Sequence, residues 1–599
     1  MSKSKRTIVP IILSVVIIGV LYYVTIPPIN IQSVQFWWFI IWCLIIVSVC
    51  FGVPRAQEGT TSFISEFLEG LNREGLAYIF KFRERRAERK KAKAEGKKQG
   101  KRGWLFWVVS AIIVLLLGIF VGQIASSALF NARAYSDLLE VKEGNFAEDI
   151  SEISMKSVPV VDKDTAVRLG SRTIGEMSDL VSQFAIDEGY DSYTQINYQN
   201  SPYRVAPLIY ADPIKWIMNT WNGLPGFVTV NMATQETQLV RLPEGKYIHI
   251  STGEHFNNQL YRYVRFRYPF EILGTAAFEL DDDGNPYWIV PTVKMRIGLF
   301  GGEDYDGIIL VDPVSGETQK YSAEEVPNWV DKAFSADLVY EQLGYYGKYR
   351  SGFINSLVGQ SGVLVPTGSA APGLFSDKNK TASAGGAKGG YNYLAINDDV
   401  YMYTGMTSAN SDESLVGFTL VNLRTKETRY YTCAGATESS AMSSAEGQVQ
   451  QMSYNATSPL LLNIADRPTY FLSLKDGAGL VKMYAFIDVQ QYQIVGTGST
   501  VADAQTAYIA ALTNDAQVKI DDRAIANSDT IPKVDGTIEA IQSVVVEGNT
   551  LFYFKLQGDS SIYIAGINAN LNLPFMGPGT QVSVTYTEKD GAREVTTLN

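Results

Sequence analysis

A dense basic run that meets an uninterrupted apolar stretch constrains this chain more than any other feature of its sequence. The run KFRERRAERKKAKAEGKKQGKR covers residues 81 to 102, and the apolar stretch covers residues 104 to 128. A stretch of this length satisfies the requirement of about 20 residues for a helix that crosses a bilayer. Because Lys and Arg are retained on the cytoplasmic side of such a helix, residues from about 129 are predicted to be extracytoplasmic.

Two further apolar stretches precede this one, at residues 8 to 26 and 34 to 53. The connection at residues 27 to 33 carries no charge, whereas the N-terminal hexapeptide and the loop at residues 54 to 103 are basic. This distribution predicts a multi-pass cell-membrane protein with a cytoplasmic N-terminus and a basic cytoplasmic loop. The loop is expected to lie against anionic membrane lipids, and binding of RNA, ribosomes or a cytoplasmic protein by it stays open.

The charge of the chain is divided unevenly. The formal net charge is −11, but residues 131 to 599 hold 34 basic and 55 acidic residues, a net charge of −21. A region this acidic repels polyanions, which argues against nucleic-acid binding by the extracytoplasmic part. Cys43 and Cys50 lie in an apolar stretch and Cys433 stands alone after residue 130, so no disulfide framework is expected there. A large exported region without disulfides favours a bacterial envelope, here of the Gram-positive type.

A hairpin pattern recurs along the extracytoplasmic region. The sequence GFVTVNMATQETQ begins at Gly226, GIILVDPVSGETQ begins at Gly307, and GFTLVNLRTKETR begins at Gly417. Each copy has β-branched and apolar residues, then Asn or Asp, a short polar stretch and a Glu-Thr pair, which predicts two strands joined by a turn. A degenerate fourth copy covers residues 483 to 497.

Helix-start signals follow the hairpins. The sequences SAEE at residues 322 to 325 and TVAD at residues 500 to 503 have the spacing of capping motifs, so helices are expected there. Helices are also expected at residues 255 to 264 and 437 to 450, and one more at residues 164 to 183 before the first hairpin. The predicted unit is therefore strand–turn–strand–helix, used about four times.

The second hairpin resembles a known family. The segment at residues 307 to 320, with VDPVSGETQK at its centre, looks like the hairpin of PepSY domains and their cystatin-like relatives. The strand NPYWIV at residues 285 to 290 and the helix before it fit the same pattern. The resemblance implies small extracytoplasmic modules that bind or inhibit partners, often peptidases or envelope proteins, and it implies no catalytic residue. The first and third copies depart from the family because they lack counterparts of Pro313 and Gly316.

Composition divides the region further. Residues 366 to 390 are rich in Gly, Ala and Ser without an apolar period and are predicted to be a flexible linker. From about residue 531, short strands alternate with Gly-containing turns, which favours a small OB-like β-barrel. We therefore predict an α+β protein with three N-terminal transmembrane helices, PepSY/cystatin-like repeats and an OB-like C-terminal barrel. The predicted parts are a membrane module (1–130), a first α+β domain (131–365), the linker (366–390), a second α+β domain (391–528) and a β-domain (529–599).

Residues with catalytic or metal-binding chemistry form no recognisable set. His249 and His255 are the only histidines, and their spacing matches no zinc motif. The sequence GQSG around Ser361 departs from a nucleophile elbow, because a valine follows where the last glycine is required. The sequence DDDGN at residues 281 to 285 lacks the glutamate that ends an EF-hand loop, and Cys433 has no cysteine partner. We therefore assign no catalytic, cofactor-binding or metal-binding residue.

These observations lead to a functional expectation. The sequence predicts a non-enzymatic, membrane-anchored envelope protein that binds or regulates a protein partner as an adaptor, scaffold or inhibitor. The chain has 34 tyrosines and 9 tryptophans, which can stack on sugars, so an extracytoplasmic sensor or glycan-binding receptor is the alternative. An envelope hydrolase is the third possibility and would depend on the two histidines.

Overall fold

The computed structural model describes most of the chain. The described residues are 5–52, 104–150, 158–177, 179–189, 193–368, 390–396, 399–409, 414–514, 533–546, 549–566, 569–570, 572–589 and 592–598. The chain divides into two compact units, and each is assembled from separate stretches of sequence. The membrane unit comprises residues 1–135, 250–274 and 291–307, and the repeat unit comprises residues 136–249, 275–290 and 308–599.

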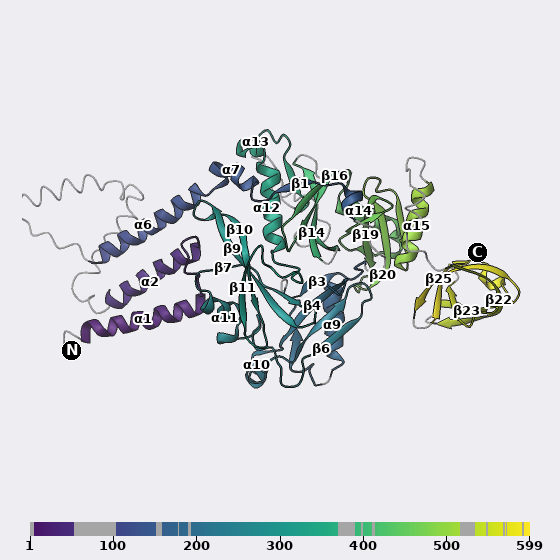
Figure 1. Cartoon of the computed structure of the whole chain (residues 1–599), viewed down its shortest axis with the longest axis horizontal. Coiled ribbons are helices and arrows are strands. Elements are labelled where there is room, and N and C mark those ends of the chain that lie inside the picture. The colour runs from purple at the N-terminus through teal and green to yellow at the C-terminus, as the bar shows by residue number, and fades with distance from the viewer. Residues whose placement is uncertain are drawn as a thin grey trace, which may run out of the picture. The chain divides into compact units, whose positions relative to one another are not determined.

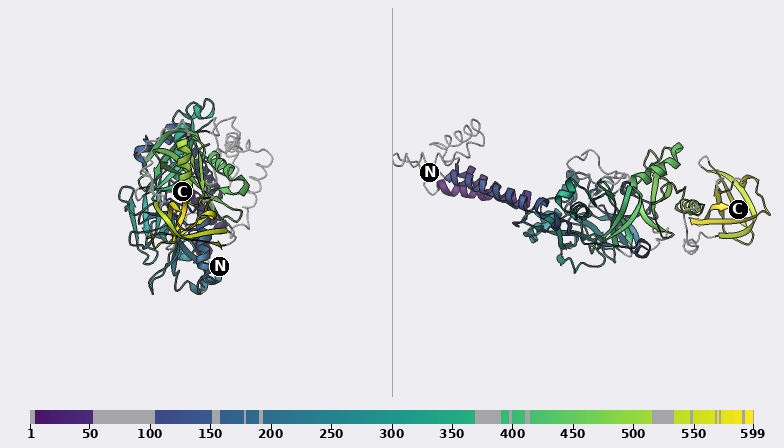
Figure 2. Two further views of the ribbon diagram at one scale, coloured as in Figure 1. Left: turned by 90° about the vertical axis from the view of Figure 1, so that its right-hand side faces the viewer. Right: turned by 90° about the horizontal axis from the view of Figure 1, so that it is seen from above.

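Three apolar helices lie side by side in the membrane unit (Figures 1 and 2). They are α1 (Lys5–Thr25), α2 (Val34–Gly52) and α6 (Trp104–Ala125). Each contains 18 or 19 residues that are apolar enough to cross a bilayer, which confirms the three candidate spans expected from the sequence. The basic loop expected at residues 54 to 103 lies outside the described residues, and the orientation of the spans stays a prediction.

The membrane unit also contains a segment that returns to the ends of these helices. α7 (Ala128–Ser136) follows α6 almost directly, and the 3₁₀ turn η3 (Phe256–Asn258) and α11 (Leu260–Arg267) come much later in the chain. Gln259 caps α11, because its side chain accepts a hydrogen bond from the backbone N–H of Arg262 at 3.0 Å. We call residues 256 to 270 the collar.

One arrangement occurs four times after the first spans: a helix followed by five strands. In each copy two short strands pair with a long third strand, and the fourth and fifth strands continue the sheet. The four sheet orders are (β2, β3)-β4-β5-β6, (β7, β8)-β9-β10-β11, (β12, β13)-β14-β15-β16 and (β17, β18)-β19-β20-β21. β1 (Val141–Glu143) adds a parallel strand beside β16, so the third sheet has six strands.

The element bounds of the four copies follow the same order. The first copy contains α9 (Lys163–Gly175), β2 (Phe184–Ile186), β3 (Thr194–Tyr198), β4 (Ser201–Tyr210), α10 (Pro213–Asn219), β5 (Gly226–Asn231) and β6 (Thr237–Arg241). The second contains α11, β7 (Ile272–Leu273), β8 (Ala277–Leu280), β9 (Pro286–Ile297), β10 (Gly301–Val311) and β11 (Thr318–Ser322). The third contains α12 (Ala336–Tyr349), α13 (Phe353–Leu357), β12 (Leu364–Pro366), β13 (Asn392–Ile396), β14 (Asp399–Ser408), β15 (Ser414–Asn422) and β16 (Thr428–Ala436). The fourth contains α14 (Glu438–Gln448), β17 (Asn455–Ala456), β18 (Leu460–Ile464), β19 (Arg467–Lys475), β20 (Val481–Asp488) and β21 (Val495–Gly498).

The hairpins predicted from the sequence are the fourth and fifth strands of each copy. Their turns open with Asn231, Asp312 or Asn422, whose side-chain oxygen accepts hydrogen bonds from the backbone N–H groups two and three residues later. These bonds are 2.8 to 3.1 Å long. The residue four positions later has a positive φ of 65° to 80° in all three, and it is glycine only at Gly316. The recurring Asn or Asp therefore fixes the turn.

The helix expected directly after the second hairpin is absent. Ser322 donates a side-chain hydrogen bond to Glu325 at 2.8 Å, but the chain continues in turns until α12 begins at Ala336. This prediction was wrong because a local capping contact forms without the following helical turns. Each helix also precedes the five strands that it accompanies, so the unit is helix and meander rather than hairpin and helix.

Other helix predictions differ in extent. The helix expected at residues 255 to 264 is divided into η3 and α11, and the helix expected at residues 164 to 183 ends at Gly175. The helices expected at 437 to 450 and after residue 500 are confirmed as α14 and α15 (Val501–Asn514).

The linker expected at residues 366 to 390 falls mostly outside the described residues. Its first residue, Pro366, belongs to β12, which pairs with β14 through Pro366 and Met406. The flexible character of the remainder stays a prediction.

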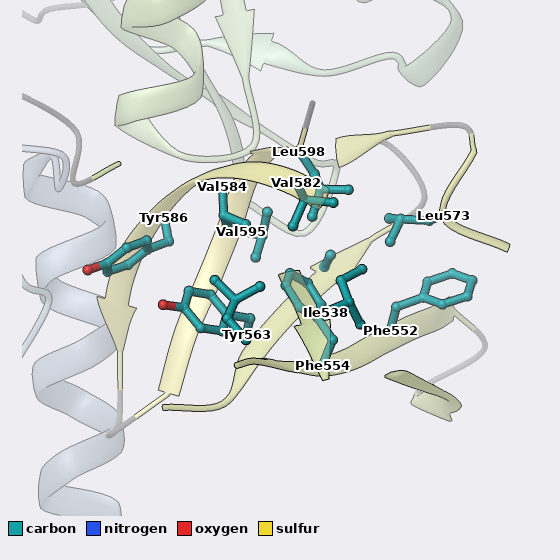
Figure 3. Packing of buried hydrophobic residues seen from close by; sticks show 12 residues of the cluster. Ile538, Phe552, Phe554, Tyr563, Leu573, Val582, Val584, Tyr586, Val595 and Leu598 are labelled. Atoms are coloured by element: carbon teal, nitrogen blue, oxygen red, sulfur yellow. The ribbon is translucent and has the colours of Figure 1, made fainter. Parts of the chain in front are cut away.

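The C-terminal strands form a closed five-stranded barrel with the order β22-β23-β24-β26-β25. The strands are β22 (Lys533–Val546), β23 (Asn549–Leu556), β24 (Tyr563–Gly566), β25 (Gln581–Lys589) and β26 (Ala592–Leu598). Its interior is filled by apolar and aromatic side chains, including the stacked rings of Phe554 and Tyr563 (Figure 3). The barrel therefore buries a core of its own, and the C-terminal region is largely β as the sequence predicted.

Candidate functional site

The repeat unit contains a cavity of about 1170 Å³ that we call the polar groove. Its walls come from α9, β3 and β4 of the first copy, from the starts of α12 and β13 of the third, and from β17 to β19 of the fourth. Residues from the connection that follows β11 complete the lining. Three of the four copies thus contribute side chains to one site.

One wall of the groove is held by an ion pair at the start of α9. Asp162 is the N-cap of this helix, and its side chain accepts a hydrogen bond from the backbone N–H of Thr165 at 2.9 Å. Lys475 at the end of β19 donates to both carboxylate oxygens of Asp162 at 2.6 Å. Burial acts to raise the pKa of the Asp162 carboxyl, but the hydrogen bonds from Lys475 and Thr165 outweigh it and the pKa is lowered.

Further contacts join the first and fourth copies along the same wall. The hydroxyl of Ser473 donates to the carbonyl of Val160 at 3.0 Å, and the guanidinium of Arg168 donates to the carbonyl of Ala478. Lys163, also on this wall, donates to the carbonyl of Gly189 at 3.4 Å. The first two bonds hold α9 and the residues before it against the fourth sheet, and the bond of Lys163 lies within the first copy.

The first copy supplies buried polar groups to the lining. The hydroxyl of Tyr193 donates to the carbonyl of Ala166 at 2.9 Å, and the guanidinium of Arg204 donates to the carbonyl of Tyr193 at 3.2 Å. Burial raises the pKa of the Tyr193 hydroxyl, so this group stays protonated at neutral pH. Gln195 is only 2% exposed, and its amide nitrogen Nε2 has no hydrogen-bond partner among the described residues.

The third copy supplies an aromatic surface. The ammonium of Lys332 lies 4.0 Å from the centroid of the Tyr393 ring, within the range of a cation–π contact. The hydroxyl of Tyr391 donates to Asp337 at 2.6 Å, and the side chain of Asn392 donates to the carbonyl of Pro459 at 2.9 Å. This side of the groove therefore presents the rings of Tyr391 and Tyr393, and Asp337 already holds the hydroxyl of Tyr391.

The groove carries charges of both signs. Its cationic residues are Lys163, Arg168, Arg204, Lys332 and Lys475, and its carboxylates are Asp162, Asp164, Glu188 and Asp337. The lining is thus close to neutral, whereas the sequence from residue 131 onward is strongly acidic. Such a surface favours a ligand that offers both donors and acceptors along its length, since a polyanion would meet the carboxylates and a polycation the ammonium groups.

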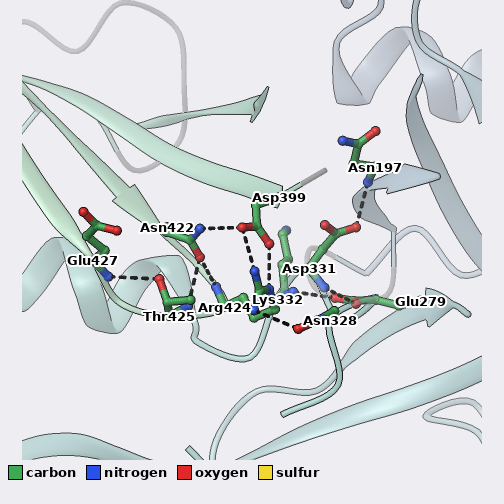
Figure 4. A network of polar contacts seen from close by, with 10 residues as sticks. All are labelled: Asn197, Glu279, Asn328, Asp331, Lys332, Asp399, Asn422, Arg424, Thr425 and Glu427. Atoms are coloured by element: carbon green, nitrogen blue, oxygen red, sulfur yellow. Dashed lines mark hydrogen bonds and ion pairs between the residues drawn. The ribbon is translucent and has the colours of Figure 1, made fainter. Parts of the chain in front are cut away.

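A buried polar network connects the first three copies (Figure 4). Glu279 of β8 is fully buried and accepts hydrogen bonds from the backbone N–H groups of Asp331 and Lys332, each at 2.9 Å. Asp331 in turn accepts from the backbone N–H of Asn197 in β3 at 2.7 Å. Burial raises the pKa of Glu279 to about 7, although the two backbone donors and the charge of Lys332 oppose the rise. The network positions Lys332, which belongs to the groove.

The third copy continues this network on its far side. Arg424 donates to Asp399 through two nitrogens, at 2.7 and 2.9 Å, and the amide of Asn422 donates to the same carboxylate at 2.8 Å. A bidentate pair of this kind is geometrically specific. It fixes the turn after β15 next to the connection that carries Asp331 (Figure 4).

The two histidines do not form a site. His249 is half-buried in the repeat unit, where its backbone N–H donates to the carbonyl of Pro313 at 2.9 Å. His255 is exposed in the membrane unit and is the N-cap residue of η3. Among the described residues, no group of three or more His, Cys, Asp or Glu side chains has the geometry of a metal site.

The other residues singled out from the sequence have local roles. Ser361 is exposed, and its backbone N–H donates to the side chain of Asn355 at 3.2 Å. Asp281 opens the turn between β8 and β9, where its carboxylate accepts hydrogen bonds from Asp283 and Asn285 at 2.7 to 3.0 Å. Cys433 is buried, and burial together with the charge of Asp488 raises the pKa of its thiol to about 11. At neutral pH this thiol is protonated and a poor nucleophile.

Sequence reasoning missed the groove. Its residues come from segments that lie up to 316 positions apart, and no single segment carries a recognisable binding motif. The one local signal is the sequence DKDT at residues 162 to 165, which marks the start of α9 but not the partner of Asp162. No known protein family matches this chain, and no curated protein matches its sequence.

Proposed function

We propose that this chain is a non-enzymatic, membrane-anchored envelope protein that holds a segment of a protein partner in the polar groove. The observation that carries the proposal is the groove itself, a large cavity lined by side chains of both charges from three copies of one repeat. Its lining contains neither histidine nor cysteine among the described residues.

The size and chemistry of the groove favour a polypeptide. Its volume of about 1170 Å³ exceeds the roughly 300 to 1,000 Å³ typical of small-molecule pockets. A peptide offers N–H and C=O groups at every residue and side chains of both signs, which complements alternating Lys, Arg, Asp and Glu.

The proposal also covers the family of the repeats, the type of the C-terminal barrel and the orientation in the membrane. The turn sequence at residues 307 to 320 supports a relation of the copies to PepSY and cystatin-like modules, which bind partners. The closed five-stranded barrel supports an OB-like assignment of the C-terminal domain. The basic residues before α6 support a cytoplasmic N-terminus and an extracytoplasmic repeat unit. The lone Cys433 after residue 130 supports a bacterial envelope, which we take to be of the Gram-positive type.

The test is site-specific photo-crosslinking of the full chain in native membranes. A photoreactive amino acid at Asn455, an exposed groove residue on β17, is expected to capture one protein at a defined peptide. The same amino acid at Thr234, on an exposed hairpin turn outside the groove lining, is the matched control. Equal capture from both positions would contradict a groove-specific partner, and capture of a glycan at Asn455 would favour the receptor alternative.

Two variants that each replace a charged side chain by a neutral one test the chemistry of the ligand. Lys163→Gln and Glu188→Gln each remove one charge from the groove at positions that are not fully buried, so the fold should tolerate both. A peptide with both charges should be crosslinked less efficiently in each variant. A polyanionic ligand would instead lose affinity only in Lys163→Gln and gain it in Glu188→Gln.

A third variant separates binding from stability. Gln195→Met removes the amide whose nitrogen has no partner among the described residues, so the free energy of unfolding should stay the same or rise, by up to about 1–3 kcal/mol. If the amide nitrogen of Gln195 donates a hydrogen bond to the ligand, crosslinking at Asn455 should fall although the protein is no less stable. Loss of stability together with loss of crosslinking would assign Gln195 to the fold instead.

A further inference from the structure

The collar is tied to the outer ends of the helices α1 and α2 by hydrogen bonds within the membrane unit. The backbone N–H of Ile29 donates to the carbonyl of Pro269 at 2.7 Å, and the side chain of Asn30 donates to the carbonyl of Phe270 at 3.0 Å. Both Ile29 and Asn30 lie in the short connection between α1 and α2. The end of the collar therefore lies at the level where the chain turns between two spans.

Two arginines of α11 strengthen this attachment. Arg262 donates to the carbonyl of Tyr23 at 3.1 Å, and its guanidinium lies 4.6 Å from the centroid of the Tyr23 ring. Arg265 is buried and donates to the carbonyl of Ile26 at 3.1 Å. These bonds satisfy carbonyl groups at the end of α1 that have no partner within the helix. The arginines thus fix α11 across the end of the span.

The span α6 has a similar attachment. The hydroxyl of Ser126, just after α6, accepts hydrogen bonds from the backbone N–H groups of Leu299 and Phe300 at 2.9 and 3.1 Å. The ring of Phe300 contacts that of Trp37 in α2, with 6.5 Å between centroids. Residues from later in the chain therefore contact all three spans at the corresponding ends.

Large apolar side chains at this level are exposed. Phe256, Phe266 and Phe270 of the collar are 64%, 47% and 63% exposed. Trp38 and Trp42 of α2 are about half exposed and lie one helical turn apart, roughly 6 and 12 Å from the start of the helix. Exposed aromatic groups at the end of a membrane span are characteristic of the interface between headgroups and acyl chains.

The charge of α11 fits the same surroundings. Its sequence LYRYVRFR contains three arginines and no acidic residue, in contrast to the acidic sequence beyond residue 130. Arg267 is exposed, lies over the Tyr263 ring at 3.5 Å and donates to the Tyr263 carbonyl at 3.3 Å. A guanidinium has five N–H donors, and this bond uses one of them. The other donors of Arg267 are suited to a phosphate.

We propose that the collar docks into the phospholipid leaflet at the ends of α1, α2 and α6. Phe266 and Phe270 enter the boundary between headgroups and acyl chains, and Arg267 binds a lipid phosphate. Continuity with the spans selects lipid as the occupant, because the collar is hydrogen-bonded to the residues at which the spans end. This inference does not depend on the groove or its ligand.

The test measures depth with spin labels on the full chain in phospholipid nanodiscs. The three native cysteines are replaced by alanine, and a label is attached at Phe270→Cys or at Asp282→Cys, an exposed position in the turn between β8 and β9. We expect the label at 270 to be relaxed by oxygen and protected from a water-soluble nickel complex, and the label at 282 to show the opposite. Access of nickel to the label at 270 would overturn the proposal.

Two further outcomes are equally decisive. Protection of the label at 270 from both oxygen and nickel would mean that protein covers the collar, which also overturns lipid docking. For the phosphate contact, Arg267→Gln should retain about fivefold less phospholipid after detergent washing, as judged by native mass spectrometry. Arg241→Gln, at an exposed ion pair in the repeat unit, is the control and should retain the same amount as the parent. Equal amounts of phospholipid on the parent and both variants would show that Arg267 does not bind a lipid phosphate.

Discussion

Glu279 is the buried carboxyl group that holds the connection between the second and third copies. Its carboxylate is fully buried, and both of its oxygens accept backbone hydrogen bonds from the connection that carries Asp331 and Lys332. The pKa of this carboxyl in the folded protein is about 7, against an ordinary value of 4.5. The perturbation is Glu279→Gln, which keeps the shape of the side chain and removes its titration.

The magnitude follows from the difference in pKa. At 1.36 kcal/mol per pKa unit, the rise corresponds to about 3 kcal/mol. Between about pH 4.5 and 7 the folded state holds a proton on Glu279 that the unfolded state has lost, so stability falls as the pH rises. The stabilisation that comes from protonated Glu279 is fully present below pH 4.5 and is lost once the pH passes about 7. Glu279→Gln should lack this slope, whatever its own hydrogen-bond cost of about 1 kcal/mol.

Hydrogen exchange of the amides of Asp331 and Lys332 is the appropriate assay, because these groups donate directly to Glu279. After correction for the intrinsic exchange rate, their protection in the parent should fall on the order of 100-fold between pH 5 and 8. The variant should show a nearly constant protection. Parallel pH profiles for the parent and Glu279→Gln would refute the assignment of a raised pKa to this carboxyl.

Other substitutions and reagents probe separate parts of the chain. Asp162→Asn should lower the free energy of unfolding by about 1–3 kcal/mol, because Lys475 loses its charged partner. In urea unfolding, the parent should lose the same stabilisation only as the pH falls below about 4, where Asp162 becomes protonated. Ser126→Ala leaves the N–H groups of Leu299 and Phe300 without their acceptor, so the exchange of both amides should accelerate in detergent micelles, and unchanged exchange would contradict the contact. Cys433 should resist a maleimide at pH 7 in the folded protein and react after unfolding, since its thiol has a pKa of about 11; rapid labelling of the folded chain would show that the thiol is accessible.

The parts of the fold that depend on local sequence were predictable. The spans follow from apolar length, and the hairpins follow from the recurring Asn231, Asp312 and Asn422, each of which organises its own turn. The α14 and α15 helices likewise begin at capping residues that can be read directly from the sequence. In all these cases the groups that decide the structure lie within a few residues of each other.

The parts that depend on distant contacts were not predictable. SAEE at residues 322 to 325 satisfies a capping pattern, yet the connection continues in turns, and further along the chain its backbone donates hydrogen bonds to the distant Glu279. The pairing of Asp162 with Lys475 joins residues 313 positions apart, and neither position carries a signal for the other. A single sequence therefore shows the repeat but not the surface that the copies form together.

The discontinuous membrane unit has a consequence for how the protein is made. The third span is complete at residue 125, but the collar begins at residue 256 and the membrane unit ends at residue 307. At roughly 5 to 20 residues per second, synthesis of the intervening chain takes on the order of 10 to 40 seconds. During that interval the ends of α1, α2 and α6 have no collar, while the whole first copy of the repeat has already emerged. Biogenesis is therefore expected to close the ends of the three spans only after the first copy has been made, and before the third and fourth copies and the barrel are complete.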